Sequence, residues 1–311
     1  MLVLNNLRKV YGTLTAVEGT SLTLLPGDIF GFIGPNGAGK TTTIKMLATL
    51  ISPTSGTASI DGIDVIAHPL EVRPLIGYMP DSFGLYDDIK AWEYLDFFAS
   101  AYRVPKADRP SIIENVLELT DLTTKKDAYV QTLSRGMQQR LCLAKCLVHD
   151  PKVLLLDEPA SGLDPRARVE IKELISELGR MGKTIIVSSH ILPELADFCN
   201  KIGIMERGKM LVSDRVESIV QRLQPSKKLA IKALGALDGI RLALDSYPEV
   251  TGVTVIDENS YSLLIDFSGD TTAQCVLLRA LIEGGHQISS FHETRMDLED
   301  VFLRVTTGSV Q

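Results

Sequence analysis

Apolar and polar positions follow two different rhythms along this chain. From residue 1 to about residue 62, short apolar runs alternate with turn residues, which predicts a small antiparallel sheet beside one central strand, IFGFIG. The later runs VLLLD and TIIVSS are short and continuously apolar, as fully buried parallel strands are. Between about residues 89 and 122 the apolar positions have helical spacing, which predicts an inserted helical subdomain. Strands that alternate with helices indicate an α/β core.

The pattern changes after about residue 222. A strand, a helix, two strands joined by a polar hairpin, a helix and a strand predict a small α+β module of the ferredoxin-like kind. A last helix over residues 297–306 would place four apolar residues on one face, Leu298, Val301, Phe302 and Val305. We therefore expect one domain at 1–222, with its helical subdomain at about 85–150, and an accessory domain at 227–311. The length of 311 residues agrees with two domains, because one compact core rarely holds so long a chain.

Composition and charge exclude several classes of protein. The chain is 45% hydrophobic and 23% charged, as soluble globular proteins are. Its net charge of −7 offers no attraction to phosphates, so nucleic acid is not an expected partner. No apolar run reaches the roughly 18 residues of a membrane span, and the N-terminus lacks a signal peptide's apolar core, so we expect a cytoplasmic chain. The four cysteines lack metal or disulfide spacing, which predicts reduced, mostly buried thiols at Cys142, Cys146, Cys199 and Cys275.

A glycine-rich loop lies between the central strand and a helix. It fits the pattern GxxxxGK[ST] and consists of Gly34, Pro35, Asn36, Gly37, Ala38, Gly39, Lys40 and Thr41, with Thr42 next in the helix. Glycines allow backbone N–H groups to approach phosphate oxygens at the positive end of a helix. Lys40 should reach the β- and γ-phosphates, and the Thr41 hydroxyl suits Mg²⁺. Because strand, loop and helix follow in that order, the loop predicts a nucleoside triphosphate site.

Two acidic residues stand at the end of the buried run VLLLD. Open α/β sheets bind ligands at the carboxyl ends of their strands. Asp157 fits Mg²⁺ binding through water, and Glu158 could polarise the water that attacks the γ-phosphate. Taken alone, the segment also fits two acids that merely end a strand.

Five motifs follow one another in the order GPNGAGKTT, LSRGMQQR, VLLLDEP, SGLDP and SSH. Over about residues 1–220 this set resembles the nucleotide-binding domains of the ABC transporter family. The resemblance implies a P-loop NTPase fold, with a mixed-sheet core, an antiparallel β subdomain and a helical subdomain. It also implies ATP hydrolysis with Mg²⁺ by a dimer with a second copy or a paralogous cassette. The implied partner is an integral membrane permease, which would hold the chain on the inner face of the cell membrane.

The resemblance also assigns roles that the pattern alone leaves open. It implies that Ser134 and Gly136 contact the γ-phosphate of the opposite protomer, although Ser134 is equally suited to cap a helix. Asp164 would link the two sites of the dimer, and His190 would contact the γ-phosphate and hold the base. Tyr11 resembles the aromatic residue that stacks on adenine, with a core tyrosine as the alternative.

Three positions depart from the family pattern. Arg135 and Met137 stand where the signature segment usually has glycine and glutamine, so we expect a working site with altered fine geometry. Asp81 stands where the family usually has a glutamine that senses Mg²⁺ and the membrane partner. Asp81 can still offer oxygen to a cation, and a plain loop acid is the alternative.

The region after Asp81 is rich in aromatic residues, as interface cores are. We predict that loop 81–88 and the following helix, with Phe83, Tyr86 and Trp92, dock a cytoplasmic helix of the permease. The tail 295–303 resembles the C-terminal module of ABC-2 type exporter ATPases, which favours export. The alternatives are a soluble ABC-type ATPase with a non-membrane partner and a binding module that hydrolyses little ATP. Fused cassettes and zinc motifs that mark the first are absent from the sequence, and Glu158 with His190 disfavours the second.

Overall fold

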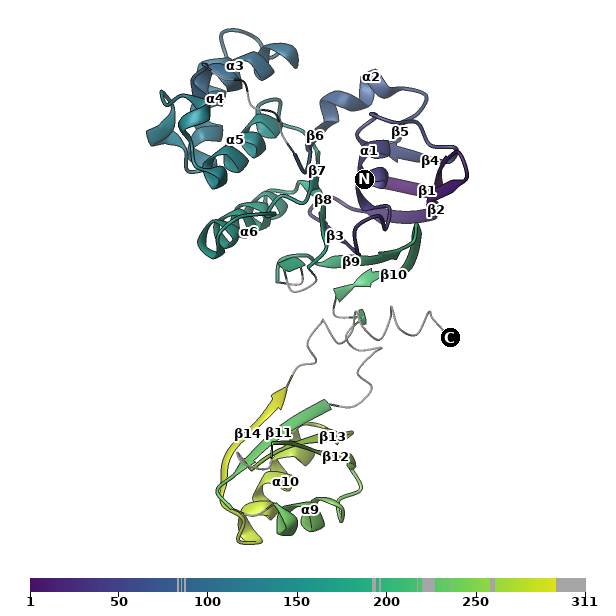
Figure 1. Ribbon diagram of the computed structural model, residues 1–311, viewed down its shortest axis with the longest axis vertical. Coiled ribbons are helices and arrows are strands. Elements are labelled where there is room, and N and C mark those ends of the chain that lie inside the picture. The colour runs from purple at the N-terminus through teal and green to yellow at the C-terminus, as the bar shows by residue number, and fades with distance from the viewer. Residues whose placement is uncertain are drawn as a thin grey trace. The chain divides into compact units, whose positions relative to one another are not determined.

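The computed structural model describes residues 1–294 except for 83, 85, 87, 192–193, 196, 217, 220–226, 236 and 258–260. The chain divides into two compact units on either side of Val216 (Figure 1). The first unit contains a six-stranded sheet, a four-stranded sheet and the helices α1 to α6, and the second contains one further sheet and the helices α9 and α10, as far as the described residues give their bounds. The helix predicted for 297–306 and the side chain of Phe83 lie outside the described residues.

The central sheet consists of β3 (Ile29–Ile33), β6 (Ile76–Met79), β7 (Val153–Asp157), β8 (Thr184–Ser189), β9 (Lys201–Glu206) and β10 (Lys209–Arg215). Their order is β10-β9-β3-β8-β7-β6, with only β10 antiparallel to its neighbour. Every residue of β3, β7 and β8 is buried, because layers cover both faces of the sheet. This burial explains why these strands read as unbroken apolar runs in the sequence.

The antiparallel sheet consists of β1 (Leu2–Tyr11), β2 (Leu14–Leu24), β4 (Ser55–Ile60) and β5 (Ile63–Asp64). Its strand order is β2-β1-β4-β5. Leu2, Leu4 and Ile60 from its inner face share one core with Phe30 and Phe32 of the central strand. The small N-terminal sheet predicted beside the central strand is therefore confirmed.

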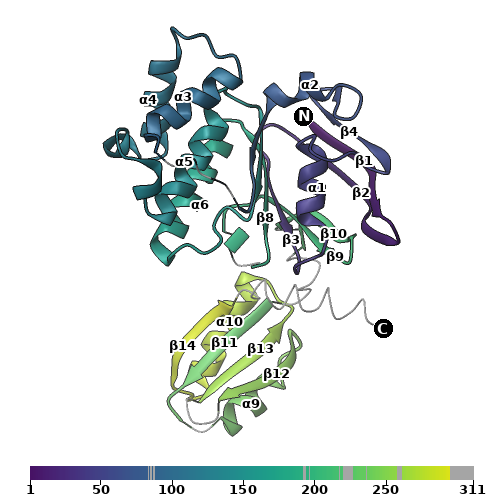
Figure 2. The ribbon, with the colours of Figure 1, turned by 45° about the horizontal axis from the view of Figure 1, so that its top comes forward.

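The first unit carries α1 (Lys40–Leu47), α2 (Pro69–Val72), α3 (Ala91–Ala101), α4 (Arg109–Leu119), α5 (Arg135–Leu147) and α6 (Pro165–Arg180). Figures 1 and 2 show α3 to α6 on one side of the central sheet, with α1 and the antiparallel sheet on the other. The predicted helical subdomain is thus confirmed. Cys142, Cys146 and Cys199 are buried free thiols and Cys275 is exposed, as expected for mostly buried cysteines. Among the described helices, none has both the length and the apolar composition of a membrane span.

The second unit has the element order β11 (Lys227–Ala233), α9 (Asp238–Leu244), β12 (Val250–Asp257), β13 (Ser262–Phe267), α10 (Thr271–Glu283) and β14 (Ile288–Thr294). Its four strands form an antiparallel sheet in the order β12-β13-β11-β14. Both helices cover one face of that sheet (Figure 2), where Ile240 and Leu277 pack with Leu229 and Ile265. The β-α-β-β-α-β order and this strand order make the unit ferredoxin-like.

Candidate nucleotide-binding site

The residues predicted for the site follow four strands of the central sheet. The glycine loop follows β3, Asp81 follows β6, Asp157 ends β7 and His190 follows β8. Because the carboxyl ends of parallel strands share one edge, residues far apart in the sequence meet there. A pocket of about 460 Å³ opens at this edge, and it is lined by Tyr11, Leu14, Ala16, Asn36, Gly37, Ala38, Gly39, Lys40, Thr41, Thr42, Asp81, Glu158, Ser161 and His190.

The glycine loop packs its backbone directly against neighbouring strands. A Cβ atom at Gly34 would lie 2.1 Å from the carbonyl oxygen of Met205, and one at Gly39 would lie 2.5 Å from that of Ala16. Gly39 also has a φ of +105°, which disfavours any residue with a side chain. Helix α1 begins directly after it, so the pocket is bordered by a helix start, where unpaired N–H groups concentrate positive charge.

Lys40 places a buried cation in the wall of the pocket. Its Nζ donates to the carbonyl oxygens of Gly34 (2.6 Å) and Pro35 (3.2 Å) and lies 3.8 Å from Glu158 Oε1. Burial lowers the pKa of Lys40, while the nearby carboxylates of Glu158 and Asp157 act in the opposite direction. An anion bound in the pocket would favour the ammonium form further.

Asp157 is fully buried, and its two carboxylate oxygens differ. Its Oδ1 accepts hydrogen bonds from the hydroxyls of Thr41 (3.0 Å) and Ser188 (2.6 Å). Its Oδ2 is buried and has no hydrogen-bond partner among the described residues. A spare carboxylate oxygen beside a hydroxyl fits a hard cation such as Mg²⁺, which takes oxygen ligands and keeps several waters. Asp157 and Thr41 are therefore the residues that could hold this ion.

Asp81 lies in an exposed loop, whereas Asp157 is fully buried. It lines the pocket, as predicted for a metal-sensing position. Its Oδ1 accepts the N–H of Ser82 (2.8 Å), a contact typical of a plain loop acid. The position of Asp81 is therefore compatible both with an oxygen donor to the metal and with a plain loop acid.

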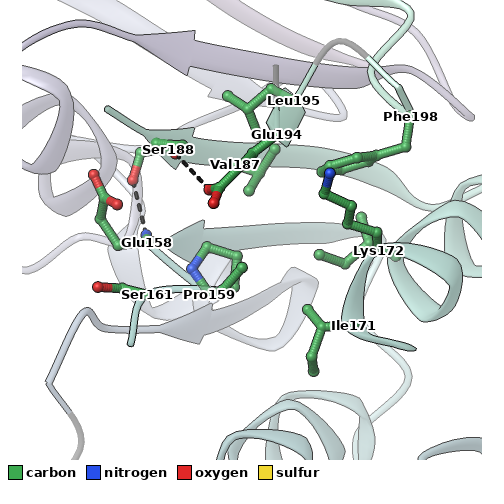
Figure 3. A pocket seen from close by; sticks show the side chains of 13 residues that line it. Glu158, Pro159, Ser161, Ile171, Lys172, Val187, Ser188, Glu194, Leu195 and Phe198 are labelled. Atoms are coloured by element: carbon green, nitrogen blue, oxygen red, sulfur yellow. Dashed lines mark hydrogen bonds between the residues drawn. The ribbon is translucent and has the colours of Figure 1, made fainter. Parts of the chain in front are cut away.

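Glu158 is held in an unusual backbone conformation between two partners. Its φ is +51°, which is strained for a residue with a side chain, and its N–H donates to Ser188 Oγ (3.0 Å; Figure 3). Its Oε2 lies 3.0 Å from Nδ1 of His190, on the side away from Lys40. The Glu158 side chain is 16% exposed and that of His190 is 47% exposed. A carboxylate fixed in this way at a pocket wall can accept a proton from a water molecule.

Tyr11 lies at the rim of the pocket. Its side chain is 47% exposed, and the neighbouring Leu14 is 65% exposed, so Tyr11 is not a core tyrosine. The ammonium of Lys9 lies 4.9 Å from the centroid of the Tyr11 ring. An exposed ring beside an apolar side chain offers a surface on which a base can stack.

Three residues predicted for the site lie outside the described lining of this pocket: Ser134, Gly136 and Asp164. Ser134 caps α5 by accepting the N–H of Met137 (3.4 Å), and Asp164 caps α6 by accepting the N–H of Ala167 (3.0 Å). Ser134 and Asp164 are exposed, and the described lining of the pocket includes none of the three. One chain alone therefore does not bring the signature segment to the glycine loop.

The predictions made from the sequence give no role to two serines of the site. Ser188 connects Asp157 to the backbone of Glu158, and Ser161 lines the pocket. Ser188 carries a usable signal, because a hydroxyl in a fully buried apolar strand requires a hydrogen-bond partner. Ser161 opens the motif SGLDP, in which only Asp164 is assigned a role.

Comparisons with known proteins agree with this geometry. The profile of the family described as "ABC transporter" matches residues 17–161. The chain is 32% identical over 308 residues to the linearmycin resistance ATP-binding protein LnrL of Bacillus subtilis, with 98% of each chain covered. It is 33% identical to the Nod factor export ATP-binding protein I of Paraburkholderia xenovorans, with 99% of this chain and 97% of that protein covered. Among solved structures it resembles a dimeric ATP-binding cassette in a post-hydrolysis state bound to ADP and Pi, with a TM-score of 0.63, 25% identity, and coverage of 70% of this chain and 99% of that one.

Proposed function

Because this chain belongs to the ABC transporter family, in which it is an ATP-binding and ATP-hydrolysing subunit, we propose that it works as a dimer that powers export through a separate membrane permease. The observation that carries the proposal is the contact of Glu158 with both Lys40 and His190 at the wall of one pocket. An ammonium, a carboxylate and an imidazole together in the lining of one pocket support the proposal.

In the proposed mechanism ATP lies along the glycine loop. The start of α1 and Lys40 contact the β- and γ-phosphates, and Tyr11 stacks on the adenine. Glu158 accepts a proton from the attacking water, and His190 holds the Glu158 carboxylate in place. Groups that are already oriented then stabilise the charge on the phosphates. Such stabilisation makes the largest contribution to catalysis in most phosphoryl transfers.

We place Mg²⁺ at Thr41 and Asp157, with Asp81 as a further oxygen donor at the pocket wall. The buried, unpartnered Oδ2 of Asp157 supports this assignment within the described residues. The chemistry supplied by a magnesium ion bound there is the neutralisation of charge on the phosphate oxygens. Ser188 orients Asp157 for this role through its 2.6 Å hydrogen bond.

The second half of the site comes from another copy of this chain or from a paralogous cassette. Ser134 and Gly136 stand at the start of α5, whose N-terminus favours an anion, and we assign them to the γ-phosphate bound by the opposite protomer. Asp164, at the start of α6, links the two sites. The exposure of Ser134 and Asp164, and the position of all three residues outside the described lining of their own chain's pocket, support this division.

The permease partner follows from the relatives and from one surface. The names of two relatives that match over nearly their whole length refer to resistance and to export, which supports an exporter. We assign the permease to the ABC-2 type. We also propose that this chain is cytoplasmic and peripheral on the membrane. Tyr86 of loop 81–88 and Phe97 of α3 are each 54% exposed, and their ring centroids lie 5.8 Å apart. We propose that this aromatic surface docks the permease. We also propose that the cassette spans residues 1–222 and that the accessory domain spans residues 227–311.

The test is ATP hydrolysis by the purified chain, and export by the chain co-expressed with the membrane permease that copurifies with it. We expect Lys40→Ala to abolish both activities, while Lys45→Ala, a lysine of the same helix outside the described lining of the pocket, leaves them near the parental rate. Tyr86→Ala should lower recovery of the permease with the chain and leave hydrolysis by the isolated chain unchanged. ATP consumption by Lys40→Ala at the parental rate would contradict the proposed site.

A further inference from the structure

A nearly buried carboxylate, Glu194, has no role in the mechanism above. Its side chain is only 12% exposed, and its Oε1 lies 2.8 Å from Nη1 of Arg168. Its Oε2 accepts a hydrogen bond from the hydroxyl of Ser189 (3.2 Å). A buried carboxylate with two specific partners, rather than solvent, fixes the relative position of the segments that carry them.

One of these segments is the motif that contains Asp164. Arg168 stands one turn into α6, and its backbone N–H donates to the carbonyl oxygen of Asp164 (3.0 Å). Its Nη2 donates to the carbonyl oxygen of Leu163 (3.3 Å). The guanidinium therefore joins Glu194 to the loop that we assign to the dimer interface.

The other segment carries His190. Ser189 is the last residue of β8, and its hydroxyl also accepts the N–H of Ile191 (3.0 Å), so it connects the end of β8 to the segment that follows the bend at His190. Figure 3 shows the Glu194 carboxylate beside the end of β8 that carries Val187 and Ser188. Because His190 Nδ1 lies 3.0 Å from Glu158, a shift of this bend would move the imidazole relative to the base.

Glu194 borders a small cavity that leaves little room for water. This cavity of about 10 Å³, at most the space for a single water molecule, is lined by the apolar side chains of Pro159, Ile171, Ile175, Val187, Leu195 and Phe198 and by polar ones that include Glu158, Lys172, Ser189 and Glu194. In such surroundings a paired charge keeps its geometry, and the loss of one partner leaves the other uncompensated.

We propose that Arg168 and Glu194 are a positioning pair that holds His190 against Glu158 and connects this contact to the Leu163–Asp164 loop. The pair rests on the proposed function, because its effect is expressed through His190 and through closure of a dimer on Asp164. Neither residue touches the nucleotide pocket in the described lining. The pair therefore acts on catalysis only through other side chains.

The first test separates turnover from binding. Glu194→Ala should lower kcat for ATP by about 10- to 100-fold, as small misplacements of catalytic groups do, and leave KM and the Kd for ATP unchanged. Glu194→Gln keeps an acceptor for Ser189 without the ion pair and should give an intermediate loss, which also covers the case that the alanine variant folds poorly. The matched control is Asp197→Asn. Asp197 also pairs with a cation of α6, Lys172 (3.2 Å), but its side chain is exposed. We expect that control to retain kcat.

The decisive readout is a double-mutant cycle with His190→Ala. If Glu194 acts through His190, Glu194→Ala should add no further loss of kcat in the His190→Ala background. An equal fold-loss in both backgrounds, or an unchanged kcat in both Glu194 variants, overturns the positioning pair. An unimpaired His190→Ala protein also overturns it, together with the role given to His190. Failure of the proposed function as a whole is distinguishable, because Lys40→Ala and Glu158→Gln would then hydrolyse ATP normally.

Discussion

The two halves of the proposed ATP site are built in different ways within one chain. In the pocket, Glu158 contacts both Lys40 and His190, which come from segments far apart in the sequence. In the signature half, the side chains of Ser134 and Asp164 accept hydrogen bonds from the first turns of their own helices. The first half is therefore positioned by the fold of a single chain, whereas the second half is presented at its surface.

This difference has a physical reason. A general base must be oriented before the reaction, and Glu158, the base that we propose, is held by Ser188, His190 and a strained backbone. A group that must arrive and leave with each cycle cannot be fixed in the same core. A helix start with a short side-chain cap can be exposed without loss of order, and it still attracts an anion.

The largest expected effect concerns the pocket half. Glu158→Gln removes the proton acceptor but keeps the size of the side chain, so we expect turnover to fall by about 10² to 10⁴-fold. ATP binding should persist, and the protein should accumulate as an ATP-bound dimer. Steady-state hydrolysis and size-exclusion chromatography with ATP measure the two effects. Unchanged turnover would refute the assignment of the base.

The next effect concerns the surface half. Ser134→Asp keeps a good helix N-cap, so stability should change little, but it places a carboxylate where we assign the γ-phosphate of the opposite protomer. We expect hydrolysis to fall by about 10² to 10³-fold, the effect of losing one oriented donor at a developing charge. Ser134→Asn is the neutral control with the same cap, and it should lose less. If both variants hydrolyse ATP normally, Ser134 does not act at the phosphate.

A smaller effect is expected at the rim of the pocket. Tyr11→Ala should weaken ATP binding by about 1–3 kcal/mol, the usual value of a base stacked on an aromatic ring, with little change in kcat. Tyr11→Trp should restore binding. Tyr261, which is 43% exposed in the second unit, provides the control Tyr261→Ala. Fluorescence titration with ATP and with a triphosphate that lacks the base distinguishes stacking from a general loss of the pocket.

The smallest effect is expected at Asp81. This side chain is exposed and already bonds the N–H of Ser82, so a further contact to a cation is worth about 0–1 kcal/mol. Asp81→Asn should raise the Mg²⁺ concentration for half-maximal hydrolysis by less than about fivefold. A titration with Mg²⁺ at saturating ATP measures the shift. An identical titration curve would leave Asp81 a plain loop acid.

That the residues of the pocket half meet at one edge of the sheet can be predicted from the sequence, for reasons that are local. The glycine loop and His190 directly follow buried strands and Asp157 ends one, and parallel strands bring such positions to one edge. Buried strands and turn residues also suffice for the antiparallel sheet, the helical subdomain and the order of elements in the second unit.

Other features depend on contacts that no local pattern encodes. The contacts of Ser188 with Glu158, and of Glu194 with Ser189 and Arg168, join segments far apart in the sequence and require the sheet register and the position of α6. The exposure of Tyr11 depends on how its hairpin extends beyond the core. The identity of the signature segment rests on a resemblance in motif order, since a serine before a helix is a common cap.

The measurement that most directly tests the shared site mixes two inactive variants, Lys40→Ala and Ser134→Asp. In a mixed dimer, one site would carry both changes and the other would carry neither. We predict that each variant alone hydrolyses almost no ATP and that the mixture recovers activity well above either one. A mixture that stays as inactive as its components, although mixed dimers are shown to form, would contradict a site divided between two copies.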